Sequence, residues 1–185
     1  MDAYSIGKTV GVLTGFVVGL VIVVIIAVIC NKNRKVKTQY DERQQIIRGK
    51  GYHYAFYAIM IFAALNVVLS LAGLELPVVP EVLAFCYIFV GAATNIVYCI
   101  FQDAYWGLNN NKKRYLIVFL LIALLNIAIV VRSYLAATLI EDGRLGTMGT
   151  NLLVAVLFLV TGLAILIQMI LEKKALGSEE ETAEV

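Results

Sequence analysis

Long apolar runs alternate with short polar segments along this chain, and each run is about the length of one membrane crossing. Five such runs lie at residues 10–30, 54–74, 82–101, 115–137 and 151–171. A helix needs about 20 apolar residues to cross roughly 30 Å of hydrocarbon. The pattern therefore predicts an all-α, polytopic integral membrane protein with five transmembrane helices, forming a single membrane domain over residues 1–185.

The polar segments predict how the chain enters and leaves these spans. Residues 31–50 are interpreted as a basic connector helix, and residues 173–185 as an acidic, flexible tail. Thr38 and Asp41 have the spacing of a capping box, so we expect a helix to begin at Thr38. The N-terminal flank lacks the basic cluster of a secretory signal, which favours an uncleaved first span.

Lys and Arg gather in alternate polar segments. Twelve lie between the first and second runs, after the third run and after the fifth, against three in the remaining segments. Because basic residues stay on the cytoplasmic side, the bias predicts the N-terminus outside and the C-terminus in the cytoplasm. With 61% hydrophobic and 15% charged residues, the composition excludes a typical soluble domain. The net charge of +2 is too small to predict a nucleic-acid partner.

Residues that carry enzymatic chemistry are scarce in the sequence. The three cysteines lie in or beside apolar runs without CxxC spacing, which disfavours a disulfide or a zinc site. His53 is the single histidine, so the sequence excludes two-histidine haem ligation within one chain and HExxH zinc chemistry. No phosphate-binding or nucleophile-elbow motif occurs. We therefore expect no enzymatic activity, no cofactor and no metal.

The first apolar run carries a regular glycine pattern. A spacing of four places these residues on one helix face, where another backbone can approach closely. The partner helix is left open between this chain, a second copy and a different protein. The glycines are Gly7, Gly11, Gly15 and Gly19.

The third run carries a polar face that extends along the whole crossing. Steps of four, four, three and four residues connect Tyr87, Gly91, Asn95, Tyr98 and Gln102. An unpaired amide or hydroxyl in hydrocarbon costs several kcal/mol, so this face is expected to avoid lipid. One interpretation is packing against polar residues of neighbouring spans. The other is a lining for water or a small polar ligand. The neighbouring polar residues include Asn66, Ser70, Asn126 and Thr161.

A cluster of charged and aromatic residues is predicted at the cytoplasmic ends of spans two and three. Its members are Asp41, Glu42, Arg43, Arg48, Asp103 and Trp106. Asp103 follows a span, where a negative charge opposes the helix dipole, so we expect a cationic partner. Arg43 or Arg48 is the expected partner, which would tie spans two and three together; a contact to a ligand or partner is the alternative. Asp41 and Glu42 also have a purely local explanation, since acidic residues suit the first turn of a helix.

Two segments carry a resemblance to a known group of proteins. YDERQQIIRGKGYHYAF and FQDAYWGLN resemble a group of uncharacterised small membrane proteins from Gram-positive bacteria. These pair an Asp-Glu-Arg segment before one span with an Asp-Ala-Tyr segment after a later span. The resemblance covers residues 40–109 and implies a multi-pass protein of a bacterial plasma membrane, without implying an activity.

Two classes of function follow. The first is a non-enzymatic membrane protein with an accessory, sensory or interaction role at its cytoplasmic face. The alternative is a small transporter or channel component that uses the polar face of the third span. No carboxylate lies mid-membrane, which counts against proton or sodium coupling and favours the first class. The expected partners are the lipid bilayer and either a second copy of the chain or another membrane or cytoplasmic protein.

Overall fold

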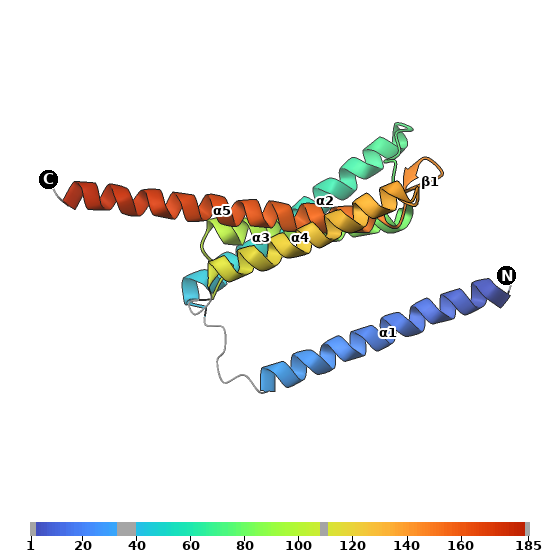
Figure 1. Ribbon diagram of the computed structural model, residues 1–185, viewed down its shortest axis with the longest axis horizontal. Helices are drawn as coiled ribbons and strands as arrows, with labels where there is room; N and C mark the ends of the chain where they lie inside the picture. The colour runs from blue at the N-terminus through green and yellow to red at the C-terminus, as the bar shows by residue number, and fades with distance from the viewer. Residues whose placement is uncertain (1–2, 33–39, 108–110, 184–185) are drawn as a thin grey trace. The chain divides into compact units, whose positions relative to one another are not determined.

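The computed structural model describes residues 3–32, 40–107 and 111–183, which form five helices and one short hairpin (Figure 1). Four of these helices, α2 to α5, are long and apolar enough to cross a membrane, so the chain is a helical membrane protein. The helices are α1 (Ala3–Lys32), α2 (Glu42–Leu71), α3 (Pro80–Phe101), α4 (Lys112–Leu135) and α5 (Gly149–Ala183). The hairpin consists of β1 (Ile140–Glu141) and β2 (Arg144–Leu145).

Helix α1 belongs to a compact unit of its own, Met1–Thr38, and Gln39–Val185 forms a second unit. The described apolar stretch of α1, Leu13–Ile22, is shorter than one crossing, so a fifth span stays a prediction. The expected glycine face lies within α1, and inside this unit an added Cβ at any of its glycines meets no atom within 4 Å. The partner of that face also stays a prediction. The glycines are Gly7, Gly11, Gly15 and Gly19.

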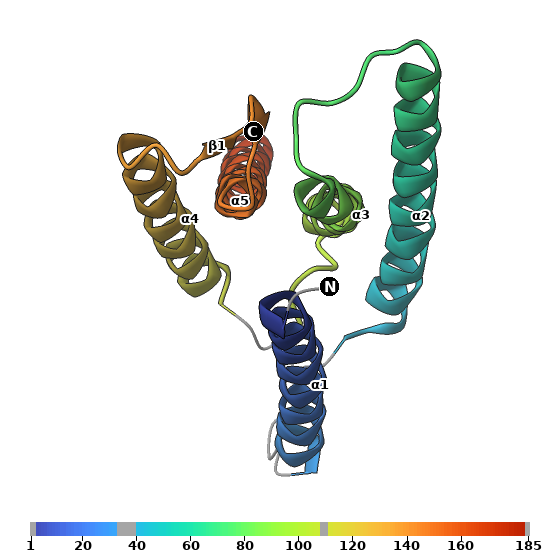
Figure 2. The ribbon, with the colours of Figure 1, turned by 90° about the vertical axis from the view of Figure 1, so that its right-hand side faces the viewer.

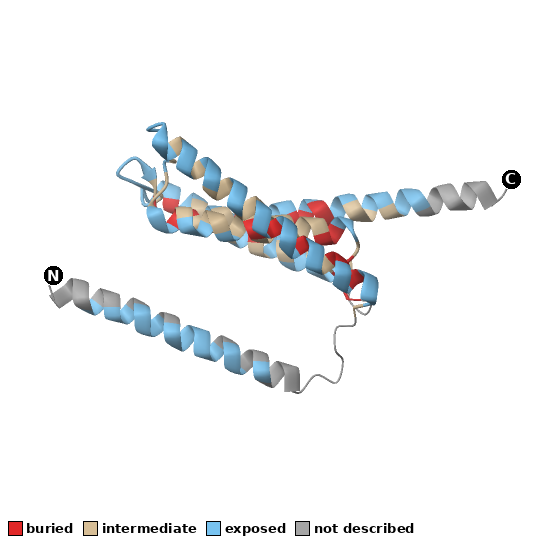
Figure 3. Ribbon diagram, turned by 180° about the vertical axis from the view of Figure 1, so that it is seen from behind, coloured by how far each residue is buried: buried red, intermediate tan, exposed pale blue. Residues whose placement is uncertain are grey.

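The second unit is a row of four helices. α2 packs on α3, α3 on α5, and α5 on α4, and Figure 2 shows them in this order across the view. The buried residues lie mainly where neighbouring helices contact one another, and many large apolar side chains on the outside of the row are exposed (Figure 3). The central cluster of buried apolar residues comes from α3, α5 and the segment after α3. It contains Ile100, Trp106, Ala164 and Ile165.

Helix α2 begins with a capping box, but not at the expected residues. Asp41 is the N-cap: its Oδ1 accepts from the backbone N–H of Gln44 at 2.6 Å, and Gln44 Oε1 accepts from the backbone N–H of Asp41 at 3.4 Å. The predicted pairing with Asp41 in the third helical position is therefore wrong, and Thr38 lies outside the described residues. Residues 42–50 form the first turns of the same helix that crosses the membrane.

Three helices end in the same hydrogen-bonded turn. After α3, the backbone N–H of Asp103 donates to Ile100 O at 3.0 Å and that of Ala104 to Cys99 O at 2.8 Å, which is a Schellman motif. The first residue after the C-cap must adopt a left-handed backbone conformation in this motif, which glycine does most easily. Of the three helices, only α2 has glycine at this position, Gly73. Asp103 (φ 53°) and Ala137 (φ 55°) fill it after α3 and α4, at a cost of about 1–2 kcal/mol each.

Helix α5 continues past the membrane-spanning part of the chain. It has 35 residues and is therefore about 52 Å long, against roughly 30 Å of hydrocarbon. Figure 1 shows it extending beyond the other helices of its unit. Residues 173–183, predicted as part of a flexible tail, are helical instead. Glu, Lys and Ala dominate this segment, and all three favour helix.

The hairpin closes one end of the second unit. Asp142 (φ 49°) and Gly143 (φ 76°) both have positive φ, the signature of a two-residue type I′ turn. Leu145 N–H donates to Pro77 O at 2.8 Å, and Val79 N–H donates to Leu145 O at 3.0 Å. The α2–α3 connection is thus bound to the α4–α5 connection at this end, the hairpin end.

The opposite end holds eight of the ten Lys and Arg residues of the second unit, and we term it the basic end. It is formed by the start of α2, the end of α3, the start of α4 and the part of α5 around Glu172. Eight of the twelve basic residues predicted on one side of the membrane therefore lie at this end, and the other four precede this unit in the chain. Which side they face stays a prediction.

Candidate functional site at the basic end

Gln44 joins the start of α2 to the segment that follows α3. Only 5% of this residue is exposed. Its Nε2 donates to the main-chain oxygen of Asp103 at 2.9 Å and to that of Trp106 at 3.3 Å, while its Oε1 completes the capping box. The hydroxyl of Tyr40 also donates to Tyr105 O at 3.5 Å. The two segments that carry the family resemblance therefore meet here in space.

Lys112 forms the centre of an ion cluster among three helices. Its Nζ lies 2.7 Å from Asp103 Oδ1, at the end of α3, and 2.6 Å from Glu172 Oε1 on α5. Gln168 Nε2 donates to the same Glu172 oxygen at 3.2 Å. The Lys112 side chain is 26% exposed and the two carboxylates 50% and 40%, so the cluster lies at the protein surface with Lys112 its most sheltered member.

The expectation of a cationic partner for Asp103 is confirmed, but the partner is not the expected one. Arg43 and Arg48 were predicted, and the structure pairs Asp103 with Lys112. The left-handed backbone of Asp103 turns the chain sharply after α3, and the next helix begins only nine residues later. The ion pair therefore joins the end of α3 to the start of α4, and α2 is held by Gln44 instead.

Trp106, a member of the predicted cytoplasmic cluster, is a buried core residue. Only 4% of this residue is exposed, and its ring lies 4.6 Å from that of Tyr105 and 5.0 Å from that of Tyr115. Among the described residues, its indole Nε1 has no hydrogen-bond partner. Burial also raises the pKa of the neighbouring Tyr105 hydroxyl. Trp106 is therefore a packing residue.

The remaining members of the predicted cluster lie on the outside of α2. Glu42 and Arg43 are exposed in the first turn. The guanidinium of Arg48 lies 4.3 Å above the ring of Tyr40, a cation–π contact. The predicted cluster is therefore not one site. Asp41 and Trp106 contact the buried Gln44, Asp103 pairs with Lys112, and Glu42 and Arg43 are exposed.

The polar face of α3 is largely covered by α2. Asn66 Nδ2 donates to the hydroxyl of Tyr87 at 3.0 Å, and the ring of Tyr98 lies edge-on to that of Tyr54 at 4.8 Å. Asn95 faces Gly51, where an added Cβ would collide with its Oδ1.

Two other polar residues named with this face are placed differently. Gln102 is exposed at the C-cap of α3. The side chain of Asn126 donates to Ile122 O of its own helix at 2.8 Å. Most of the face therefore packs between two helices, as one of its two interpretations predicted.

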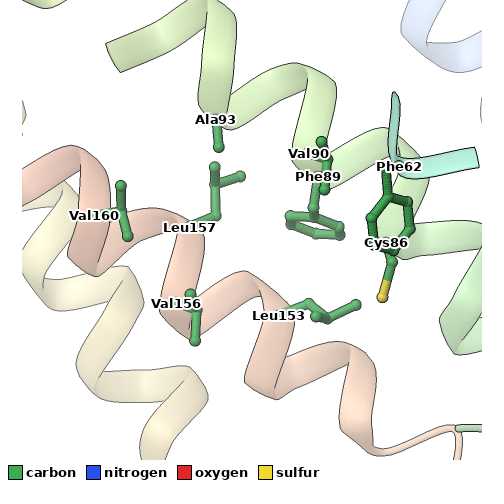
Figure 4. Close-up of a pocket in the computed structure, with 9 residues that line it drawn as sticks. All are labelled: Phe62, Cys86, Phe89, Val90, Ala93, Leu153, Val156, Leu157 and Val160. Atoms are coloured by element: carbon green, nitrogen blue, oxygen red, sulfur yellow. The ribbon is translucent and has the colours of Figure 1, made fainter. Parts of the chain in front are cut away.

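An apolar groove of about 240 Å³ runs between α3 and α5 (Figure 4). Apart from one thiol, its lining offers no polar side-chain atom, so it suits a hydrocarbon chain and not a polar solute. The residues that line it are Phe62, Cys86, Phe89, Val90, Ala93, Leu153, Val156, Leu157 and Val160.

A second hollow, of about 260 Å³, lies at the hairpin end and is more polar. Asn66 and Ser70 contribute to it from α2, and Arg144 Nη2 donates to Glu75 Oε2 at 2.8 Å at its rim. That ion pair is exposed, so it contributes only about 0–1 kcal/mol to stability. The hollow adjoins the outer part of the α3 polar face through Asn66.

Gln44, Lys112 and Glu172 were not identified by sequence reasoning. A signal for Gln44 was present, because Asp41 followed three residues later by Gln is itself a capping-box pattern. Nothing in the sequence pairs Lys112 with Glu172, which are 60 residues apart.

Comparisons of this chain with protein-family models, curated proteins and solved structures give no match. Within residues 3–32, 40–107 and 111–183, no three His, Cys, Asp or Glu side chains are grouped so as to hold a metal ion.

Proposed function

We propose that this chain is a non-enzymatic membrane protein with an accessory, sensory or interaction role, carried out at its basic end. The observation that supports this proposal is the joining of four helices there. Gln44 connects α2 to the end of α3, and Lys112 connects α3, α4 and α5. An end built in this way presents a fixed surface to a partner.

The extension of α5 supplies a second element of the proposal. It continues as one helix from Glu172 in the ion cluster to Ala183. A partner bound to the extension would act directly on the contact between Glu172 and Lys112. Binding would thereby be coupled to the packing of α4 and α3, which is what a sensory or accessory subunit requires.

Site-specific photocrosslinking in native membranes tests this function. The crosslinking side chain is placed at Arg43 or at Lys173, both exposed at the basic end, and at Leu163 as a control, which is 57% exposed in the middle of α5. We expect discrete protein adducts from positions 43 and 173 but not from position 163. Their mass distinguishes a second copy of the chain from another protein. Adducts with lipid alone at all three positions would contradict the proposal.

The cellular setting is also part of the proposal. We place the basic end in the cytoplasm, with five spans and an external N-terminus, in the plasma membrane of a bacterium. Positive-inside asymmetry supports the orientation, and the resemblance of residues 40–109 to small membrane proteins of Gram-positive bacteria supports the source.

A small transporter or channel component is the second candidate. The polar hollow at the hairpin end, which shares Asn66 with the α3 polar face, favours it. Proteoliposomes containing the chain should then release a small polar solute faster than protein-free vesicles, and Asn66→Leu should slow that release. Equal release from both kinds of vesicle rejects this candidate and leaves the first unaffected.

A further inference from the structure

Residues 50–57 of α2 carry a basic and aromatic face. Lys50, His53, Tyr54 and Tyr57 line a shallow hollow of about 300 Å³ on this helix. Their spacing of three, one and three residues places them on one side of the helix. All four residues are exposed, Tyr57 by 61%.

The polar groups of this hollow lack partners within the part of the chain that the structure describes. Lys112, by contrast, contacts two carboxylates, and Arg48 lies over Tyr40. No acidic residue lines the hollow. It therefore offers an ammonium group, an imidazole and two phenol hydroxyls without a competing negative charge. This set of donors complements a phosphate group.

The same side of α2 continues as an apolar surface toward the hairpin end. Ile61, Leu65 and Val68 are 69%, 53% and 60% exposed, and they follow Tyr57 at helical spacing. The distance along the helix from Tyr57 to Val68 is about 16 Å at 1.5 Å per residue. An acyl chain can lie along this length while its headgroup stays beside Lys50, at the level where Lys and Tyr side chains meet the membrane boundary.

We propose that this face of α2 binds one anionic phospholipid. Lys50 and His53 contact its phosphate, the hydroxyl of Tyr57 donates to a phosphate oxygen, and one acyl chain packs along Ile61 and Val68. The inference depends neither on the function proposed above nor on the orientation of the chain, because anionic lipid in either leaflet would meet the same residues.

Native mass spectrometry of the full chain in a mild detergent, with equimolar phosphatidylglycerol and phosphatidylcholine, tests the site. We expect the chain to retain phosphatidylglycerol in preference. Lys50→Gln should lower that retention about fivefold, the usual contribution of one basic residue near an anionic surface. Tyr57→Phe, which keeps the ring, should lower it about twofold to threefold. The matched control is Lys113→Gln, which removes the same charge from an exposed position at the same end and should change retention less than twofold.

Three results would overturn the proposal. Equal retention of the two lipids shows that the face does not select anionic headgroups. An equal loss in Lys50→Gln and Lys113→Gln shows a general effect of charge and not a site. Binding of inorganic phosphate without retention of phosphatidylglycerol assigns the hollow to a soluble anion. Thermal unfolding of each variant is measured in the same detergent, and Tyr57→Phe alone decides the test if Lys50→Gln does not fold.

Discussion

The side-chain amide of Gln44 donates to the main-chain oxygen of Asp103 at 2.9 Å and so connects residues 59 positions apart. The same nitrogen reaches Trp106 O, and the amide oxygen of Gln44 caps its own helix. Gln44 therefore fills three hydrogen-bonding positions from a site that is 5% exposed. The start of α2 and the turn after α3 depend on one side chain.

Replacing Gln44 should destabilise the protein more than replacing its neighbour. Gln44→Ala leaves two carbonyl groups without their donor, at a cost of about 1–3 kcal/mol. Gln45 is exposed and donates only to Tyr40 O at 3.2 Å, so Gln45→Ala should change stability by about 0.5 kcal/mol or less. Thermal unfolding in a mild detergent measures both, and equal losses would show that Gln44 acts only as part of the cap.

Gln44→Glu distinguishes the two roles of Gln44, capping α2 and hydrogen bonding to the segment after α3. A glutamate in this position can still accept from the backbone N–H of Asp41, as in an ordinary capping box. It cannot donate to the oxygens of Asp103 and Trp106, and it places a negative charge beside both. We therefore expect Gln44→Glu to be at least as destabilising as Gln44→Ala. A stability close to that of the unmodified chain would assign the role of Gln44 to capping.

The ion pair between Asp103 and Lys112 should be measurable in a double-mutant cycle. Asp103→Asn, Lys112→Gln and the double variant should give a coupling of about 0.5–1 kcal/mol, since both side chains are partly exposed. The coupling should fall as the salt concentration rises. Arg43→Gln in the Asp103→Asn background serves as the control and should be additive. A coupling to Arg43 in place of Lys112 would contradict the observed pair.

Asp103 and Ala137 both have a left-handed backbone at a helix end, so replacing each by glycine gives a second measure of the Asp103–Lys112 ion pair. Ala137→Gly removes the strain of a positive φ, and it should stabilise the protein by about 1 kcal/mol. Asp103→Gly removes similar strain but also the carboxylate that contacts Lys112. We expect a smaller gain or a net loss at position 103. Equal gains in thermal unfolding would mean that the ion pair contributes nothing.

Much of the fold could be predicted from the sequence because hydrophobic runs determine membrane helices directly. Helices α2 to α5 correspond to the four runs assigned to them, although α2 ends three residues and α4 two residues before the predicted end of its run. The need of Asp103 for a cation was also predictable, since it follows from the helix dipole alone. The identity of that cation was not, because Lys112 reaches Asp103 only through the left-handed turn after α3.

The helical extension of α5 was missed for a different reason. Polarity after residue 173 indicates exposure to water, but it does not distinguish an exposed helix from a frayed tail. The hairpin turn at Asp142 and Gly143 could have been predicted, because an Asp-Gly pair is a strong signal for a type I′ turn.

The orientation of the chain rests on the asymmetry of basic residues and can be tested with fused reporters. A reporter that is active only in the cytoplasm should work after Val185 and fail in the loop between Pro77 and Pro80. A reporter that is active only outside should give the opposite pattern. A third fusion, before Met1, should behave like the loop fusion if α1 spans the membrane. The reverse pattern at Val185 would contradict the positive-inside prediction.

Two glycines near the start of α2 should respond in opposite directions to the same substitution. Gly49 faces open space, and alanine there lowers the entropy lost on helix formation. Gly49→Ala should therefore stabilise the protein by about 0.5–1 kcal/mol. At Gly51 an added Cβ would collide with Asn95 Oδ1 and lie 3.1 Å from Cys99 Sγ. Gly51→Ala therefore requires the Asn95 side chain or the two helices to shift, and overpacking of this kind costs about 1–3 kcal/mol.

Removing the Asn95 side-chain oxygen tests whether it causes the loss of stability expected for Gly51→Ala. Asn95→Ala deletes the colliding oxygen, so Gly51→Ala should cost less in that background than in the unmodified chain. The Asn95→Ala variant alone gives the necessary reference, and Gly49→Ala should add the same gain in both backgrounds because it contacts neither residue. Thermal unfolding in one detergent compares all of these variants. An equal cost for Gly51→Ala in both backgrounds would show that Asn95 does not limit how closely α2 and α3 approach.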